Sequence, residues 1–569
     1  MFILLNPPSP AGRVSNKEMM GGFGQCYPGD CTVKVPPLDL VYTASVLQET
    51  GVNFKVIECL GADISAENLP EALSRLPEKI EIIFIRTSTS TYGMDLELAG
   101  KLKELTGALT VFFGPHADIN AETIIKERHV DGLVLGEPEY TVPDICLKGF
   151  KGTEGIWYKE NGTVVKKNKK EPLRDLDKLP FPAWELFPYK AYNVDVHLPV
   201  KGTTLFILTS RGCPFFCDYC PYPVAQGSQY RKRSAENVLA ELKELAAKYR
   251  VKNILIRDAE FTLDKSRAVD ICNGIINAGL KINFRCETRA DTLDEELLTL
   301  MARAGFTGLN MGIESASERV IERSGRKQTD REHIARLVEK CRQLKINVFC
   351  FYIIGLPGDD LDSIIETLNF AERLNADVSQ FTIATPYPGT KLYAWAKEHD
   401  FIENFISDNI TGYEAMLKNE DLSREQILAL RNDVQARVDS IRKYGSKPAA
   451  KQLGKNSPFS FPVLRALKKL AKKEDRIVLY GARGVSPEAL KKQGFNIAGI
   501  IDEIYFGEKV DGFTVMRPLV LSAYKAQVLL VSPLKRSANI KQYLGGIKVA
   551  ESLVLAKNIA KKLKNMVKK

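Results

Sequence analysis

The sequence predicts an α/β protein of several domains, because short apolar strands alternate with amphipathic helices along most of the chain. The alternation in residues 1–150 favours a doubly wound parallel sheet. From 203 to about 395, six consecutive strand–helix units favour a partial barrel. A smaller α/β unit begins near residue 474. With 569 residues, the chain is too long for one hydrophobic core, in agreement with this division.

The first run contains five predicted strands and three predicted helices. The strands are expected at 2–6, 54–59, 80–88, 109–114 and 131–136, and the helices at 38–50, 66–76 and 94–106. In doubly wound sheets, ligands bind beyond the carboxyl ends of the strands. Here those ends carry Ser88, Thr89, Ser90, Gly114, His116, Gly136 and Glu137.

The remaining chain divides at changes of pattern. A connector is expected at 151–200, with a small hairpin turning at Asn161-Gly162. The barrel follows at 201–430, with strands expected at 204–210, 253–261, 282–291, 308–315, 347–355 and 378–386. Beyond it we expect a basic helical linker at 431–473, a small Rossmann-like α/β domain at 474–550 and a basic tail at 551–569.

Composition places the chain among soluble, reduced proteins. No stretch approaches the 18 apolar residues that a membrane-spanning helix needs, and the N-terminus does not resemble a secretory signal. Eight of the eleven cysteines are scattered through apolar patterns, where cysteine behaves as a small hydrophobic residue. A disulfide framework is not expected in such a chain. We therefore expect a cytoplasmic location.

The other three cysteines form one motif, C-x3-C-x2-C, at Cys213, Cys217 and Cys220, directly after a predicted strand. Thiolates bind iron–sulfur clusters or zinc. Structural zinc has four ligands, and no fourth Cys or His stands nearby in the sequence. Three ligands on a four-iron cluster leave one iron open to bind a small molecule. A zinc knuckle is the alternative interpretation of this spacing.

The motif, with Tyr219 before its last cysteine, resembles the radical S-adenosylmethionine (SAM) superfamily. This resemblance implies that Cys213, Cys217 and Cys220 hold a four-iron, four-sulfur (4Fe–4S) cluster whose free iron binds SAM. Tyr219 would then lie beside the adenine. Later strand ends supply the other expected SAM contacts, which are Asp258 and Glu260 for the amino group, Arg289 for the carboxylate, Glu314 and Ser315 for the ribose, and Gly355 for the adenine.

Residues 1–145 resemble the cobalamin-binding domain of a large radical SAM subclass. The expected cobalamin contacts are Ser88, Thr89, Ser90, Gly114, His116, Gly136 and Glu137. The subclass lacks the DxHxxG signature, as this chain does, so no axial histidine is implied and His116 is read as loop structure or a contact to the corrin rim. A flavodoxin-like domain without cobalamin is the alternative.

Together, the two resemblances imply a cobalamin-dependent radical SAM enzyme. Its expected reaction is methylation of an unactivated carbon through a 5′-deoxyadenosyl radical and methylcobalamin. A non-methylating cyclase or oxidase is one alternative, and a non-catalytic iron–sulfur and cobalamin-binding sensor or scaffold is another. An electron donor such as flavodoxin or ferredoxin is the expected partner, and the substrate is expected to be a small molecule or a lipid-linked one.

The C-terminal third carries weaker signals. Asp502 stands where an acid could reach a ribose in a Rossmann-like nucleotide site, but Gly481 and Gly484 form only G-x-x-G and not the full dinucleotide fingerprint. A packing domain without a ligand is therefore an equal alternative. Residues 440–473 hold ten Lys or Arg and no acidic residue. This stretch predicts either a solvated helix face or peripheral contact with anionic lipid. No nucleic acid is expected, because no aromatic stacking motif accompanies the basic run.

Overall fold

The computed structural model describes residues 1–193, 201–327, 330–402 and 410–444, and the backbone of five short strands between 476 and 531. The chain divides into two compact units. The first comprises Met1–Gly358 and Ala376–Asn419, and the second comprises Asp359–Asn375 and Glu420–Lys569. The expected α/β class is confirmed, and the finer domain boundaries stay predictions.

The N-terminal part of the first unit is a seven-stranded sheet in the order β4-β1-β5-β6-β7-β8-β9. Its parallel strands are β1 (Phe2–Asn6), β4 (Phe54–Glu58), β5 (Ile82–Arg86), β6 (Leu109–Phe113) and β7 (Gly132–Val134). The hairpin expected in the connector joins this sheet as antiparallel strands β8 (Ile156–Glu160) and β9 (Thr163–Lys166). Its turn at Asn161-Gly162 has positive φ at both residues, as an Asn-Gly hairpin requires.

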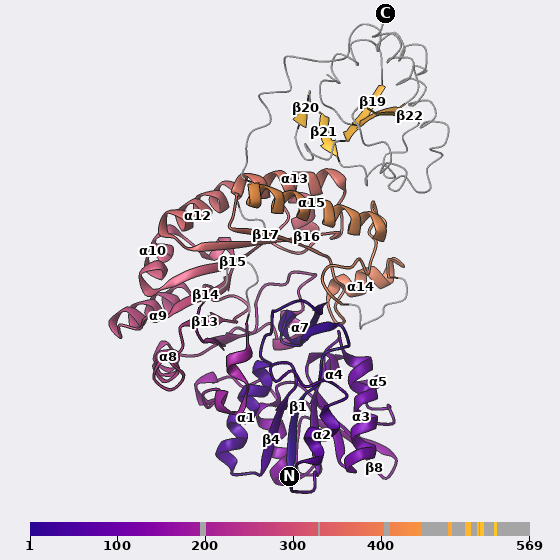
Figure 1. The fold of residues 1–569 in the computed structure, drawn as a ribbon, viewed down its shortest axis with the longest axis vertical. Helices are drawn as coiled ribbons and strands as arrows, with labels where there is room; N and C mark the ends of the chain where they lie inside the picture. The colour runs from indigo at the N-terminus through magenta and orange to yellow at the C-terminus, as the bar shows by residue number, and fades with distance from the viewer. Residues whose placement is uncertain are drawn as a thin grey trace, which may run out of the picture. The chain divides into compact units, whose positions relative to one another are not determined.

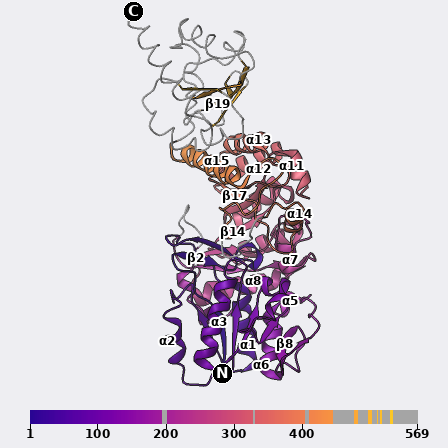
Figure 2. The ribbon, with the colours of Figure 1, turned by 90° about the vertical axis from the view of Figure 1, so that its right-hand side faces the viewer.

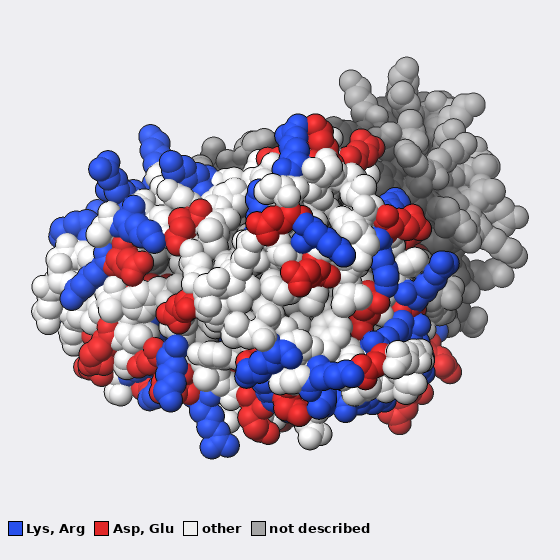
Figure 3. All heavy atoms as spheres, turned by 90° about the horizontal axis from the view of Figure 1, so that it is seen from below, with Lys and Arg blue, Asp and Glu red and all other residues white. Residues whose placement is uncertain are grey.

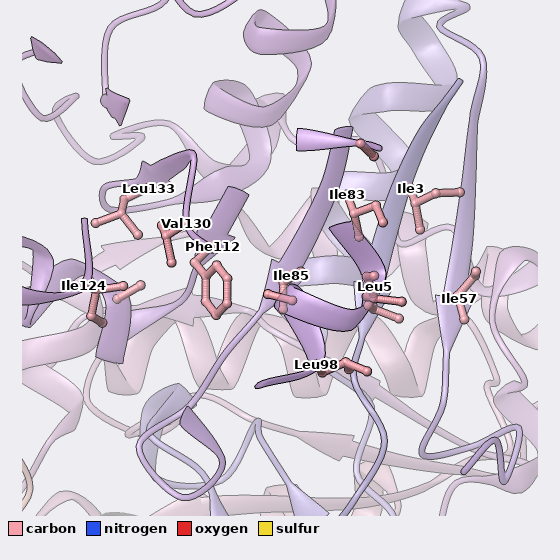
Figure 4. Close-up of a cluster of buried hydrophobic side chains, with 14 of the residues drawn as sticks. Ile3, Leu5, Ile57, Ile83, Ile85, Leu98, Phe112, Ile124, Val130 and Leu133 are labelled. Carbon is pink, nitrogen blue, oxygen red and sulfur yellow. The ribbon is translucent and has the colours of Figure 1, made fainter. Parts of the chain in front are cut away.

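Helices cover this sheet in the first unit (Figure 1). They are α1 (Leu38–Thr50), α2 (Leu69–Ser74), α3 (Tyr92–Thr106), α4 (Pro115–Ile119), α5 (Ala121–Ile124) and α6 (Pro138–Lys148). Fully buried side chains such as Ile3, Ile83 and Phe112 come from adjacent strands and form one core, with Leu98 packing onto it from α3 (Figure 4). Parallel strands covered by helices on both faces are apolar almost throughout, which explains the continuous apolar runs of the sequence.

The barrel part is a six-stranded, all-parallel sheet in the order of the sequence. Its strands are β10 (Thr204–Ile207), β13 (Asn253–Ile256), β14 (Asn283–Thr288), β15 (Phe306–Glu314), β16 (Asn347–Ile354) and β17 (Val378–Ile383). The helices of the first unit between and after them are α7 (Tyr222–Gln226), α8 (Ala235–Tyr249), α9 (Lys265–Asn277), α10 (Glu295–Ala304), α11 (Glu318–Arg323), α12 (Arg331–Leu344) and α14 (Lys391–Glu398). All six predicted barrel strands are confirmed.

Side-chain caps fix where several barrel helices begin. Ser234, Asp264 and Asp294 each accept a hydrogen bond from a backbone N–H in the first turn of α8, α9 and α10. Such caps satisfy donors that the helix itself leaves unpaired. The strand-to-helix loops are therefore defined, and these loops carry the candidate site.

Two short antiparallel pairs lie near the junction of the two sheets. One joins β2 (Arg13–Asn16) to β3 (Gln25–Pro28), with the 3-10 turn η1 (Met20–Gly22) between them. The other joins β11 (Ser210–Arg211) to β12 (Arg231–Lys232). Figure 1 and Figure 2 both show α7 between the N-terminal sheet and the barrel sheet. The loop around η1 therefore reaches the helix that follows the cysteine motif.

The second unit contains α13 (Leu361–Leu374), α15 (Arg424–Tyr444) and a five-stranded sheet in the order β20-β21-β19-β18-β22. Arg437 pairs with Glu372 at 2.7 Å and joins the two helices. The strands are β18 (Arg476–Tyr480), β19 (Asn496–Ile501), β20 (Lys509–Val510), β21 (Phe513–Met516) and β22 (Val528–Val531). Gly481, Gly484, Asp502, the basic stretch beyond residue 444 and the tail 551–569 lie outside the described residues.

In the described part of the chain, no helix has the length and apolar character to span a membrane. The face drawn in Figure 3 carries acidic and basic side chains interspersed. Mixed charge of this kind does not form a single-sign field on that face.

Candidate metal centre and the surrounding strand ends

The three cysteines of the motif lie in the loop that leaves β11 at the carboxyl end of β10. Cys213 is buried, while Cys217 and Cys220 are half-buried. The Cys220 N–H donates to the carbonyl of Cys217, and the Cys213 N–H donates to the carbonyl of Gly227. Within the described ranges, no group of three or more His, Cys, Asp or Glu converges to hold a single metal ion. A four-iron cluster spaces its thiolates more widely than a single ion does, because each thiolate binds a different iron.

Asp258 accepts hydrogen bonds from the residues that lead into the cysteine loop. Its carboxylate is fully buried and accepts hydrogen bonds from the Thr209 backbone N–H at 2.6 Å and the Ser210 hydroxyl at 2.6 Å. Arg267 adds a contact at 3.5 Å. The carboxylate therefore already has internal partners, and its expected contact with the SAM amino group stays a prediction.

Glu260, two residues after Asp258, differs from it because one of its carboxylate oxygens has no hydrogen-bond partner among the described residues. Its Oε1 accepts hydrogen bonds from the hydroxyls of Thr262, Thr288 and Thr292 at 2.7, 3.1 and 3.0 Å. Its Oε2 is buried and has no hydrogen-bond partner among the described residues. Burial raises the pKa of Glu260 to about 7. A buried acceptor without a partner costs free energy unless a ligand supplies a donor, so this site fits an ammonium group.

Glu314 ends β15 in an unusual conformation. Its φ is +65°, in the left-handed region that a residue with a side chain seldom adopts. Arg326 lies 3.3 Å from its carboxylate, donates to the Tyr219 hydroxyl at 3.2 Å and donates to the Gly312 carbonyl at 2.7 Å. Burial raises the pKa of Glu314, and Arg326 opposes that effect. Arg326 therefore joins Tyr219 of the cysteine loop to the end of β15.

Arg326 supports a stability prediction. Its side chain and that of Glu314 are about nine-tenths buried. Replacing Arg326 by Met would leave a buried carboxylate without its cation, and we expect this to destabilise the first unit by about 3–5 kcal/mol. Thermal unfolding of Arg326→Met and of Arg326→Met with Glu314→Gln tests the prediction. The double variant should recover most of the loss, and equal losses in both variants would contradict this role of the pair.

The Arg289 guanidinium contacts three neighbours. Its Nε and Nη2 each donate to the Asp291 carboxylate at 2.8 Å, and its charge lies over the Phe215 ring at 4.1 Å. Its Nη1 is 3.8 Å from the Cys217 Sγ. Arg289 therefore lies beside the cysteine motif. Its pairing with the SAM carboxylate stays a prediction, because Asp291 already occupies two of its donors.

Ser315 and Gly355 lie at the ends of neighbouring strands. The Ser315 hydroxyl accepts from the Ser317 backbone N–H at 3.1 Å. Gly355 follows β16 with φ +88°, which glycine adopts without strain. The structure thus places Tyr219, Glu260, Arg289, Glu314 and the cysteines around the carboxyl ends of the barrel strands. The roles of Ser315 and Gly355 at the ribose and adenine stay predictions.

The serine-rich loop after β5 is fully buried. The Ser88 hydroxyl lies 3.2 Å from that of Ser90, and the Thr89 N–H donates to the Phe23 carbonyl at 2.9 Å. A Cβ on Gly24 would lie 2.6 Å from the hydroxyl oxygens of Ser88 and Ser90. The glycine-rich loop 21–24 therefore covers these hydroxyls and belongs to the candidate site. Sequence reasoning missed it, although three glycines in four residues were a signal.

His116 and Gly114 lie beside that loop. The His116 Nδ1 is 3.0 Å from the Thr89 hydroxyl, and its ring packs on Tyr92 at 4.8 Å between centroids. Burial lowers the pKa of His116 to about 4, so the ring is neutral near pH 7. Gly114 has φ +111°, and a Cβ there would lie 2.6 Å from the Thr87 carbonyl, so only glycine fits. Because loop 21–24 covers these hydroxyls, contact of Ser88, Thr89, Ser90, Gly114 and His116 with cobalamin stays a prediction.

The neutral, internally bonded His116 leads to a second prediction. If it is loop structure and not an axial ligand, His116→Ala should retain bound cobalamin and leave the cobalt(II) electron paramagnetic resonance (EPR) spectrum unchanged. We expect affinity to fall by at most about tenfold, since only one contact is lost. A loss of nitrogen splitting from the cobalt signal would instead identify His116 as an axial ligand.

Gly136 and Glu137 connect the first sheet to the barrel. A Cβ on Gly136 would lie 2.9 Å from the Lys169 side chain. Glu137 faces Arg211 at 3.2 Å and Arg231 at 2.8 Å, both from the hairpin at the base of the cysteine loop. Its carboxylate therefore already has two cationic partners, and direct contact with cobalamin stays a prediction. The two arginines were not expected from the sequence, although Arg211 stands two residues before Cys213.

The half-exposed face of the barrel strands carries polar groups. Arg257 pairs with Glu287 on the neighbouring strand, and its Nη2 lies 3.4 Å from the Tyr222 hydroxyl. Asn310 stands opposite Glu287 in the register of β14 and β15. The Nε of Arg257 and the Oδ1 of Asn310 are buried without hydrogen-bond partners in the described structure. Arg257, Glu287 and Asn310 form a polar layer that Arg257 connects to Tyr222, in the helix after the cysteine motif.

Comparison with known proteins relates this chain to the radical SAM superfamily. A profile of the radical SAM superfamily matches residues 207–371. An uncharacterized methyltransferase of Pyrococcus horikoshii is 32% identical over 402 residues, which cover 69% of this chain and 86% of that protein. An anaerobic magnesium-protoporphyrin IX monomethyl ester cyclase of Rubrivivax gelatinosus is 23% identical, covering 69% of this chain and 72% of that protein.

One solved structure has a similar fold. It is the radical SAM methyltransferase TsrM of Kitasatospora setae with cobalamin and a 4Fe–4S cluster bound. The TM-score is 0.56 at 18% sequence identity, with 70% of this chain and 78% of that chain covered.

Proposed function

This chain belongs to the radical SAM superfamily, and on that premise we propose that it is a cobalamin-dependent methyltransferase acting on an unactivated carbon. One observation carries the proposal. The cysteine loop and the strand ends of the N-terminal sheet lie in the same compact unit and are joined by buried ion pairs. A domain suited to cobalamin is thus held against a domain suited to the cluster and SAM.

The residues present fit these groups. Cys213, Cys217 and Cys220 would hold the cluster, and the unpartnered Oε2 of Glu260 would accept the SAM ammonium. When bound, the cluster would supply the electron that cleaves SAM, and cobalamin would carry the methyl group. Arg326 would keep Tyr219 and Glu314 in place.

The protein's own contribution is orientation and exclusion of water. The loop that contains Phe23 and Gly24 closes over the serine-rich edge of the first sheet. The polar layer of Arg257, Glu287 and Asn310 lines the barrel face where a substrate would lie. Fixed groups in a dry site orient a reactive intermediate and prevent its quenching by solvent.

A second candidate is a non-methylating cyclase, favoured by the likeness to the Rubrivivax enzyme. Both functions predict 5′-deoxyadenosine, and only the methyltransferase predicts methyl transfer to cobalamin. The third candidate, a non-catalytic sensor or scaffold, predicts neither product.

The proposed partners are a low-potential electron donor such as flavodoxin or ferredoxin and a small-molecule or lipid-linked substrate. Phe216, between two cluster cysteines, has 64% of its surface exposed, which supports docking of a donor close to the cluster. A cytoplasmic location with peripheral contact to anionic membranes is part of the proposal. Pelleting with anionic liposomes at low salt tests that contact, and no binding would contradict it.

The test of function uses the full chain reconstituted with iron, sulfide and cobalamin under anaerobic, reducing conditions. SAM labelled in its methyl group should yield S-adenosylhomocysteine, labelled methylcobalamin and 5′-deoxyadenosine. Formation of 5′-deoxyadenosine without label in cobalamin would favour the cyclase. Absence of all three products would favour the sensor.

A further inference from the structure

Glu137 stands at the junction of the two domains of the first unit. It precedes Pro138, the first residue of α6, and stands three residues after the end of β7. Its Oε1 is 3.2 Å from Arg211 and 2.8 Å from Arg231, and its Oε2 accepts from Arg231 at 3.0 Å. The Leu173 backbone N–H also donates to Oε2, at 3.0 Å. One carboxylate of the N-terminal domain thus binds two cations of the barrel domain.

The two arginines bracket the cysteine motif. Arg211 ends β11, two residues before Cys213, and Arg231 begins β12, which pairs with β11. The register places Arg211 opposite Arg231, so the segment that carries all three cysteines leaves and returns at this pair. Glu137 therefore holds both ends of the cysteine segment at one point.

Further contacts hold Arg211 and Arg231 in place. Arg231 donates to the carbonyl of Gln226, the last residue of α7, at 2.9 Å, and to the carbonyl of Leu173 at 2.9 Å. Arg211 also pairs with Glu139 at 2.6 Å. The side chains of Arg211, Arg231 and Glu139 are at most 7% exposed. Buried, bidentate arginine pairs fix direction as well as distance.

Glu137 is ionised where it binds the two arginines. Burial alone would raise its pKa, but Arg211 and Arg231 lower the pKa of Glu137 to about 2. The carboxylate is therefore ionised over the whole physiological pH range.

We propose that Glu137 is a positioning residue that sets the cysteine segment, through Arg211 and Arg231, against the strand ends of the N-terminal sheet. This inference rests on the proposed function, because its consequence concerns two cofactors in two domains. SAM cleavage needs only groups of the barrel domain. Methyl transfer from SAM to cobalamin needs both domains in register, and a misplacement of about 1 Å can cost ~100-fold in rate.

The test compares two reactions that require no substrate. Glu137→Gln removes the charge, and Arg231→Lys keeps a charge but loses the fork that reaches Glu137, Leu173 and Gln226. For each reconstituted holoenzyme, iron content, bound cobalamin, the rate of 5′-deoxyadenosine formation and the rate of S-adenosylhomocysteine formation per bound cobalamin are measured, so that lost cobalamin is told apart from lost positioning. Glu241→Gln is the control, because Glu241 pairs with Arg233 in a buried site inside the barrel domain.

We expect Glu137→Gln to keep its iron and its 5′-deoxyadenosine rate within about twofold, while methyl transfer to cobalamin falls by about 10- to 100-fold. Arg231→Lys should show the same selective loss to a smaller degree, and it decides the test if Glu137→Gln does not fold. Glu241→Gln should leave the ratio of the 5′-deoxyadenosine rate to the S-adenosylhomocysteine rate unchanged. Equal loss of both rates, or loss in neither, would overturn the positioning role. A wild-type protein without methyl transfer would instead refute the proposed function.

Discussion

Replacing Cys217 by alanine is expected to abolish 5′-deoxyadenosine formation, with a fall of about 1,000-fold or more, equivalent to ~4 kcal/mol of lost transition-state stabilisation. The reason is the number of ligands. The motif supplies three thiolates, and the scattered cysteines lie in other elements of the fold. A cluster that loses one of three protein ligands has no thiolate in the loop to replace it.

The control for this variant is Cys272→Ala. Cys272 is fully buried in α9 and behaves as a small hydrophobic residue. It should keep its iron and its activity, although with some loss of stability. Iron analysis and product formation are measured on both variants after the same reconstitution. Full activity of Cys217→Ala would contradict the cluster assignment and favour a structural role for the motif.

The second large effect is a pH dependence carried by Glu260. Its buried carboxyl has a pKa raised to about 7, and its free Oε2 is our proposed acceptor for the SAM ammonium. Only the ionised form can pair its charge with that of an ammonium. SAM affinity should therefore be full above pH 7 and should fall by about tenfold for each pH unit below it.

Glu260→Gln separates this effect from other titrations. Glutamine keeps the shape of the side chain and one acceptor oxygen, but an NH2 donor replaces the second oxygen and the charge is lost. We expect it to bind SAM about 10- to 100-fold more weakly near pH 8, since the ion pair between carboxylate and ammonium is lost, and to lose the pH dependence. Equilibrium binding of SAM to the reconstituted protein between pH 6 and 8.5 provides the measurement. A wild-type affinity that is flat with pH would contradict the role of Glu260.

Much of the fold was predictable because it depends on local pattern. Apolar runs separated by helical periodicity located the parallel strands of both sheets, and Asn161-Gly162 located a turn. The cysteine motif was predictable for the same reason, since its spacing is local. The addition of the hairpin 156–166 to the first sheet was not, because pairing with β7 depends on packing.

The partners within the site were less predictable. Asp258 and Glu260 are two residues apart and were given the same role, yet only Glu260 has an unpartnered oxygen. The difference lies in which hydroxyls of distant strands face each carboxylate. Arg326 lies 107 residues from Tyr219 in the sequence, and no local pattern connects them. Contacts of this kind are decided by topology, which a single sequence does not display.

The most direct test of the central claim is one preparation analysed for metals, cobalamin and products together. After anaerobic reconstitution, each chain should contain about four irons and about one cobalamin, without zinc. Methyl-labelled SAM should then give labelled methylcobalamin together with 5′-deoxyadenosine. A chain that binds stoichiometric zinc in place of iron, or that cleaves SAM while leaving cobalamin unlabelled, would contradict the assignment of a cobalamin-dependent radical SAM methyltransferase.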